Sequence, residues 1–105
     1  MPLKNQAFEI FSTIKESGIR VPLSIGDTAF YSYWKPSNQT DTPDDDWSAT
    51  IDDLEEGDIS YKIPANILDE AGEWCLRPYV IKDGNRIYSD EGESLTVDEL
   101  TRCSE

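Results

Sequence analysis

Residues 59–63, Ile59-Ser60-Tyr61-Lys62-Ile63, alternate strictly between apolar and polar side chains. A period of two is the pattern of a β-strand with one face in a core and the other in solvent. An acidic turn around Gly57, over residues 52–58, leads into this segment, and Pro64 ends it. This stretch therefore predicts a fold built from strands.

The same pattern recurs along the chain in short segments separated by turn residues, which is typical of an all-β sandwich. We expect strands at residues 7–15, 20–23, 28–34, 47–51, 59–63, 73–81, 86–89 and 95–97. Pro22 places the second of these at an edge, and Asp83-Gly84-Asn85 is a hairpin turn. Apolar residues do not keep helical spacing for more than about two turns.

One short helical turn is expected around residues 64–71, because Pro64 suits a first helical position and Gly72 suits the end of a helix. Residues 36–46 carry no large apolar side chain and predict a loop. The length of 105 residues fits one domain over residues 1–98, with a flexible start at 1–5 and a polar tail at 99–105.

Charge and composition exclude several classes of protein. The chain holds 22 Asp+Glu against nine Lys+Arg, a net charge of −13, and no histidine. The lack of histidine excludes His-ligated metal sites and Ser-His-Asp or Cys-His nucleophiles. The negative charge repels phosphate backbones and anionic lipid, so we expect neither a nucleic acid nor a membrane as partner. We expect no cofactor.

The sequence also bears on where the protein is made. No apolar run is long enough to span a membrane, and the first residues lack an apolar signal stretch, so we expect synthesis in a cytosol. Cys75 and Cys103 are too few for a disulfide framework and lack a Cys-x-x-Cys spacing. They are expected to be free thiols, and the sequence assigns neither a role.

From Gly18 to Val97 the chain resembles a recurrent bacteriophage module. The pattern begins with Leu23-Ser24-Ile25-Gly26-Asp27-Thr28, followed by an aromatic strand that ends in Lys35-Pro36. It continues through Gly57 and Ile59 to Pro64, and ends with a Leu-x-x-Ala-Gly-x-Trp run over residues 68–74 that enters the strand up to Val80. This sequence departs from the family pattern by one residue between Leu23 and Gly26, and its acidic loop after Pro36 is longer than the loop of the pattern.

The resemblance is to the immunoglobulin-like β-sandwich at the N-terminus of phage baseplate upper proteins, and to related small tail and neck proteins. It implies a single antiparallel sandwich and a non-enzymatic structural role in a virion, in the tail, baseplate, neck or capsid surface. Synthesis would then take place in the cytoplasm of a bacterial host. The implied partners are other virion proteins or copies of the same chain. The family offers no catalytic residues.

Aromatic residues supply the candidate interface. The family pattern turns Ala29, Tyr31 and Tyr33 inward, which leaves Phe30 and Trp34 on the outer face, with Tyr79 and Ile81 beside them across the sheet. A contiguous exposed apolar patch usually marks a partner surface. The predicted interface therefore consists of four residues: Phe30, Trp34, Tyr79 and Ile81. An alternative of equal weight is that loops or the N-terminal segment cover this face, so that no partner reaches it.

Two acidic loops, with Asp44, Asp45 and Asp46 in one and Asp52 and Asp53 in the other, are expected to be solvated surfaces that aid solubility. Hard oxygen ligands suit Ca²⁺, but a calcium loop that begins at Asp52 would need a glutamate where Ile63 stands. We therefore do not expect a Ca²⁺ site. A carboxylate pair for glycoside hydrolysis is disfavoured, because the acids lie on turns.

Two other functions use the same residues differently. A carbohydrate- or receptor-binding module would stack sugar rings on exposed tryptophans, with Trp34, Trp47 and Trp74 as the candidates, beside acidic loops. An acidic inhibitor or nucleic-acid mimic would need the carboxylates to form one dense face, whereas the sequence spreads them over several turns.

Overall fold

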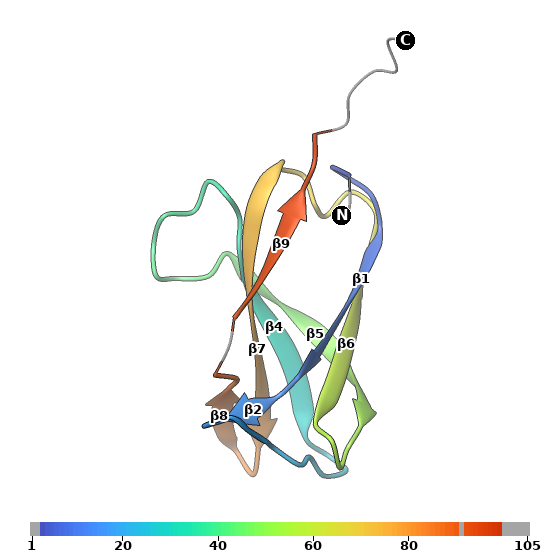
Figure 1. Ribbon diagram of the computed structural model, residues 1–105, viewed down its shortest axis with the longest axis vertical. Coiled ribbons are helices and arrows are strands. Elements are labelled where there is room, and N and C mark those ends of the chain that lie inside the picture. The colour runs from blue at the N-terminus through green and yellow to red at the C-terminus, as the bar shows by residue number, and fades with distance from the viewer. Residues whose placement is uncertain (1–2, 91, 100–105) are drawn as a thin grey trace.

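A single antiparallel sheet, curled upon itself, makes up most of the structure (Figure 1). The computed structural model describes residues 3–90 and 92–99. The sheet contains β1 (Phe8–Thr13), β4 (Thr28–Trp34), β5 (Asp45–Asp53), β6 (Asp58–Ile63), β7 (Gly72–Lys82), β8 (Asn85–Tyr88) and β9 (Glu93–Val97). A separate hairpin pairs β2 (Lys15–Glu16) with β3 (Ile19–Arg20).

The strand order β1-β6-β5-β4-β7-β8 explains the curl. The first half of β5 pairs with β4, and its second half, from Thr50, pairs with β6, with a shift of register between Ile51 and Asp53. A strand that passes from one neighbour to the other in this way bends the sheet. The all-β, sandwich-like class is confirmed, but its two facing layers belong to one continuous half-barrel.

Strand β7 is the longest and pairs along both edges. One edge carries β4, and the other carries β8 beside residues 79–82 and β9 beside residues 72–76. Pro78 lies in the break between β8 and β9, and its carbonyl oxygen accepts the Ser89 N–H at 2.9 Å. The N–H and C=O of a residue point to the same edge of a strand, so the N–H that proline lacks would face that break. A proline inside this strand therefore costs no ladder hydrogen bond.

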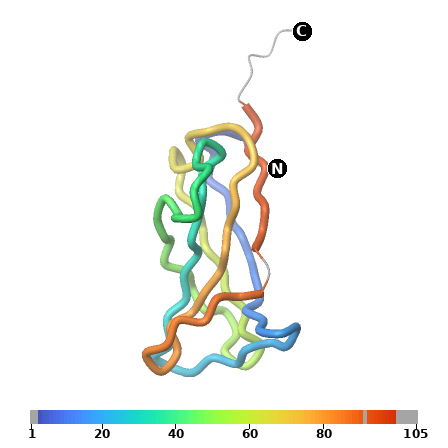
Figure 2. Tube along the Cα trace, turned by 90° about the vertical axis from the view of Figure 1, so that its left-hand side faces the viewer, coloured from blue at the N-terminus to red at the C-terminus, as the bar shows by residue number. Residues whose placement is uncertain are grey.

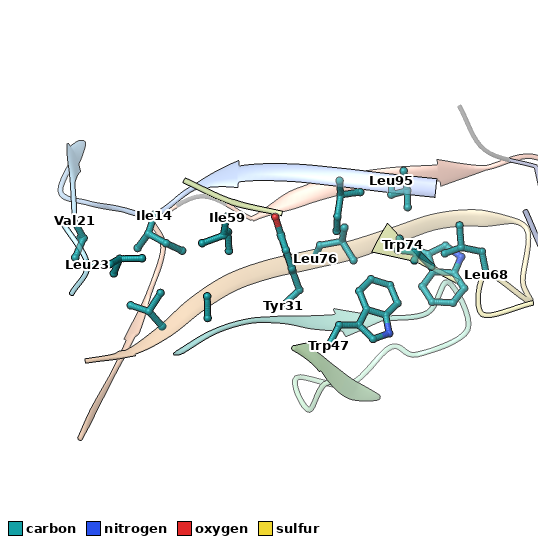
Figure 3. Packing of buried hydrophobic residues seen from close by; sticks show 14 of the residues in the cluster. Ile14, Val21, Leu23, Tyr31, Trp47, Ile59, Leu68, Trp74, Leu76 and Leu95 are labelled. Atoms are coloured by element: carbon teal, nitrogen blue, oxygen red, sulfur yellow. The ribbon is translucent and has the colours of Figure 1, made fainter. Parts of the chain in front are cut away.

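The concave face of the sheet holds the core (Figure 3). In β7 the predicted alternation is correct, because Trp74, Leu76 and Val80 are 0–2% exposed. Trp74 donates its indole N–H to the Glu70 carbonyl oxygen at 2.8 Å, which satisfies the polar atom of the largest buried side chain. The aromatic part of this core comprises Tyr33, Trp47, Tyr61 and Trp74.

The expected helical turn at residues 64–71 is wrong. This segment is a non-helical turn in which Asn66 takes a left-handed conformation with a φ of 71°. Its backbone pairs with the start of the chain: Asn66 N donates to Asn5 O at 3.0 Å, and Asn5 N donates to Leu68 O at 2.7 Å. These long-range bonds replace the local bonds of a helix.

The two acidic segments also differ from the expectation. Asp45, Asp46, Asp52 and Asp53 lie within β5 and not in loops, because β5 is longer at both ends than the predicted strand. Asp46 can occupy a strand since its carboxylate accepts hydrogen bonds from the hydroxyl groups of Ser32 on the neighbouring β4 and of Tyr79 on β7, the strand beyond it. Asp44 remains in the loop, where it accepts the Lys35 N–H at 2.7 Å.

Both ends of the chain meet at the end of the molecule that carries the turn 64–71. In the start that we expected to be flexible, Leu3 bridges Asp98, and Lys4 N donates to Asp98 O at 2.8 Å. The opposite end, here called the hairpin end, carries the β2–β3 hairpin, residues 21–27 and the β7–β8 turn (Figures 1 and 2). Of the tail that we expected over residues 99–105, Glu99 is described, 3.5 Å from Lys4 Nζ, and residues 100–105 lie outside the described residues.

Replacing Trp74 with alanine is expected to destabilise the protein by about 3–5 kcal/mol, because it leaves a large cavity in the aromatic core. That is a large share of the 5–15 kcal/mol typical of a whole domain. Chemical denaturation followed by circular dichroism measures the loss. Trp34→Ala, on the outer face, is the matched control and should remain folded. Equal midpoints for Trp74→Ala and the unchanged protein would contradict this assignment.

Gly57 closes the β5–β6 turn against the hairpin end. Its φ is +70°, and an added Cβ would lie 2.5 Å from the Val21 carbonyl oxygen. Gly57→Ala is therefore expected to cost about 1–3 kcal/mol of unfolding free energy from backbone strain, plus the cost of this clash. Gly84→Ala is the control, because Gly84 has a φ of +80° with open space around it. Thermal unfolding should rank the Gly57 variant lower, and the reverse order would refute the close contact.

Candidate functional site

The four predicted interface residues lie on the outer face of the sheet, opposite the core. Phe30 stands directly beside Tyr79, and their rings stack with centroids 5.2 Å apart. Tyr88 on β8 continues the row at 5.0 Å from Tyr79. Trp34 lies on the same face of β4, four residues from Phe30. Ile81 follows Tyr79 by two residues and is half-buried.

Tyr79 is on the predicted face but its own chain covers it. Its side chain is 2% exposed. Phe30 and Tyr88 flank the ring, and the guanidinium of Arg86 stands 4.8 Å from its centroid. The surface that a partner would meet at this row therefore consists of Tyr88, which is 45% exposed, together with the exposed Arg86 and the half-buried Phe30.

Asp46 fixes this row from β5. Its carboxylate accepts the Tyr79 hydroxyl at 2.6 Å and the Ser32 hydroxyl at 2.8 Å. Burial raises the pKa of Tyr79 to about 12, and the hydrogen bond to the negative Asp46 adds to the shift. The sequence analysis treated Asp46 as a solvated loop residue and missed this role, because the pairing of β5 with β4 is not visible in local pattern.

The remaining acidic residues do not converge. Within residues 3–90 and 92–99 there is no group of three or more acidic or cysteine side chains placed to hold a metal ion. Asp44 and Asp45 flank the start of β5, and Asp52 and Asp53 its far end. These four carboxylates are exposed, and they do not surround a common point where a cation could bind.

The tryptophans divide into two kinds. Trp47 and Trp74 are 7% and 0% exposed, so neither offers the exposed ring that the alternative carbohydrate-binding module would need. Burial within the aromatic core explains the difference, because both stack there on Tyr33. Trp34 is half-buried and lines a groove of about 520 Å³ between the outer face and the loop over residues 35–44.

A second hollow of about 700 Å³ lies on the open side of the half-barrel, where β1 approaches the start of β9. The Tyr31 hydroxyl donates to Ser12 Oγ at 2.8 Å, and the Ser12 hydroxyl donates to Glu93 Oε2 at 2.7 Å. Burial is the main cause that raises the pKa of Tyr31. The sequence analysis missed Ser12 and Glu93, since residues 81 positions apart give no local signal.

The hairpin end exposes two isoleucines that the sequence analysis did not single out. Ile19 on β3 is 71% exposed, and Ile25 in the following loop is 93% exposed. Both sit next to turn glycines, Gly18 and Gly26, and this position is the signal that would have found them. A large aliphatic side chain at the tip of a turn has no core residues to pack against.

Cys75 is a free, exposed thiol on the outer face of β7, and Cys103 lies outside the described residues. The described part of the chain contains no helix that is long and apolar enough to cross a membrane.

Comparisons with protein-family models, with curated proteins and with solved structures found no match to this chain. Function is therefore argued from the geometry of the surface.

Alkaline titration tests the Asp46–Tyr79 contact. Because the folded state holds the Tyr79 proton up to a pH of about 12, while an unfolded tyrosine loses it near 10, stability is expected to fall as the pH rises through this window. Asp46→Asn should lower the pKa of Tyr79 towards 10 without reaching it, because burial persists. Tyrosinate absorbance, with Tyr79→Phe to assign the transition, measures the shift. An unchanged titration in Asp46→Asn would show that the contact has no energetic effect.

Proposed function

We propose that this protein is a non-enzymatic structural component of a bacteriophage particle, in the tail, baseplate, neck or capsid surface. It acts by contact with other virion proteins or with copies of itself. The observation that carries the proposal is the pair of exposed isoleucines, Ile19 and Ile25, at one end of the molecule. The phage context rests on the sequence resemblance over residues 18–97.

Exposed isoleucines favour a docking role on energetic grounds. Moving one such side chain from water into a contact contributes about 1.5–3 kcal/mol. A few buried anchors of this size supply most of the affinity of a typical interface. Two anchors at one end give a contact with a defined location, in keeping with a building block that occupies a fixed place in an assembly.

The segments that carry these isoleucines are held in place. Asp27 N donates to Ser24 O at 3.0 Å, and Ser24 N donates to the Asp27 carboxylate at 2.8 Å, so the turn around Ile25 is closed on itself. The hydrogen bond from Ser24 N is the main cause that lowers the pKa of Asp27. An anchor on a preorganised turn loses less conformational entropy on binding than one on a free loop.

The β2–β3 hairpin is tied down in the same way. Gly18 N donates to the Asp90 carboxylate at 2.8 Å, and Asp90 N donates to Lys15 O at 2.9 Å. Arg20 pairs with Glu56 at 2.6 Å. Such ion pairs neutralise charge locally, so the hairpin end is better suited to meet an acidic neighbour than the net charge of −13 suggests.

The outer face offers a second contact in the proposal. Phe30, Trp34, Tyr79 and Ile81 remain the predicted interface there, with Tyr88 and Arg86 as the parts of the row that a neighbour would touch first. Tyrosine, tryptophan and arginine are the residues enriched in energetically important contacts. The acidic residues of β5 other than Asp46, which binds Tyr79 within this contact, would then face solvent. Neither nucleic acid nor membrane belongs to the proposal.

The double variant Ile19→Ser/Ile25→Ser tests the proposal. Sedimentation velocity should detect an oligomer of the unchanged protein, or a complex with products of the neighbouring genes expressed with it. Loss of two anchors should weaken that association about one hundredfold or more, with an unchanged circular-dichroism spectrum.

Ile67→Ser is the control, because Ile67 is 37% exposed in the turn 64–71 at the opposite end of the molecule. This variant should assemble like the unchanged protein. A protein that stays monomeric in every mixture, or a complex that the double substitution leaves intact, would overturn the proposal.

A further inference from the structure

We propose that the groove between Trp34 and the loop over residues 35–44 binds a neutral saccharide unit. This site lies on the outer face at the base of that loop, away from the hairpin end, and shares only Trp34 with the predicted outer-face interface. A saccharide ligand goes beyond the protein partners of the proposed assembly role. Its volume of about 520 Å³ is within the range of small-molecule sites, about 300–1,000 Å³. One sugar residue of a longer glycan is an occupant of suitable size.

Trp34 provides an aromatic platform that is available to a ligand. Trp47 and Trp74 stack on other rings in the core, whereas Trp34 has no stacking partner among the described residues. Its ring is half-buried and lines the groove beside Cys75 and Leu76. The negative face of an indole ring attracts the C–H groups on one face of a pyranose. Trp34 is therefore placed to hold a sugar ring by stacking.

The loop supplies neutral polar groups opposite this platform. Asn38, Gln39 and Thr40 line the groove, as does Ser94 from β9 on the other side. Asn38 Nδ2 and Gln39 Nε2 each use one hydrogen within the loop, to Thr42 O and Pro36 O, and each amide nitrogen carries a second hydrogen for a ligand. Such uncharged groups match the hydroxyl groups of a sugar. A few polar groups beside an aromatic surface are the usual means by which a small-molecule site fixes the orientation of its ligand.

Three charged residues line the groove, Asp41, Arg77 and Glu93, and two of them are engaged elsewhere. The guanidinium of Arg77 donates to the carbonyl oxygens of Ser89 and Asp90 at 3.0 and 3.1 Å. Glu93 accepts the Ser12 hydroxyl on the other side of the sheet. With the Arg77 guanidinium occupied and the exposed Asp41 carboxylate in the lining, the groove disfavours an anionic ligand, as does the net charge of −13. A neutral sugar can donate a hydroxyl group to such a carboxylate.

The loop is preorganised although it has no regular secondary structure. Asn38 N donates to Lys35 O at 2.9 Å, and the Asn38 side-chain oxygen accepts both the Thr40 N–H at 2.9 Å and the Thr40 hydroxyl at 2.7 Å. Asp44 N donates to Tyr33 O at 2.8 Å, which fixes the far end of the loop on β4. A loop held by its own hydrogen bonds keeps the groove open without a ligand and reduces the entropy lost on binding.

Titration with free sugars, followed by amide and indole N–H NMR spectra of isotope-labelled protein, tests the site. The probes are glucose, galactose, N-acetylglucosamine and rhamnose at millimolar concentrations, with glycerol as a polyol that has no ring. At least one sugar is expected to shift the Trp34 indole signal saturably, together with amides of residues 38–41 and 92–94. Glycerol should not do so.

Two variants give the matched comparison. Trp34→Ala is expected to weaken binding at least tenfold. Ser94→Phe should block the groove, whereas Thr96→Phe, two residues further on the same face of β9 and outside the lining, should bind like the unchanged protein. Both β9 positions are exposed and aromatic residues suit strands, so these variants should fold even if the Trp34 variant does not.

Two results would overturn the proposal. One is the absence of a saturable Trp34 shift with all four sugars. The other is binding that Ser94→Phe leaves unaffected, which would place the contact elsewhere. Neither result depends on the hairpin end. A failure of the saccharide proposal would therefore not affect the assembly proposal, which the Ile19→Ser/Ile25→Ser variant tests separately.

Discussion

Strand β7 is hydrogen-bonded along both edges, and the remaining architecture depends on this pairing. Residues 75–81 pair with β4 on one side, while β8 and β9 share the other side on either side of Pro78. Trp74, Leu76 and Val80 then face a common interior. The transfer of β5 from β4 to β6 curls the sheet so that β6 and β1 cover this interior. A chain of this size has room for one such core.

The side chains that fill the concave face determine which side chains of the same strands remain on the outer face for contact with a partner. The alternation that turns Tyr31 inward turns Phe30 and Trp34 outward, and the row on the outer face is stabilised by the Asp46 carboxylate. The connections between strands gather the remaining exposed groups at separate places: isoleucines at the hairpin end and the polar loop beside Trp34. The protein thus presents distinct surfaces on one framework, which suits contact with more than one kind of partner.

Local pattern was sufficient for most of the strands and for their faces. The alternation in residues 28–34 and 73–81 predicted which side chains face the core, since the side-chain period of a strand is independent of its partners. It did not predict that Ser32 and Tyr79, on the outer face, are covered there by neighbouring side chains. Long-range pairing was not predictable in this way. The sequence of residues 64–71 is compatible with a helix start, and only the hydrogen bonds to Asn5 show why the segment is a non-helical turn. Asp46 has the local sequence of a loop residue, and only the folded chain brings it to Ser32 and Tyr79. The candidate surfaces at Ile25 and at the Trp34 groove likewise depend on segments that meet only in the folded chain.

The most direct test of this account is native-state hydrogen exchange of the backbone amides. Double-edged pairing predicts that amides of β4 and of the central part of β7 exchange slowest, at the rate of global unfolding, while those of the β2–β3 hairpin and of residues 35–44 exchange faster. Protection that is strongest in the hairpin, or equally weak throughout β4 and β7, would contradict the claim that β7 organises the fold.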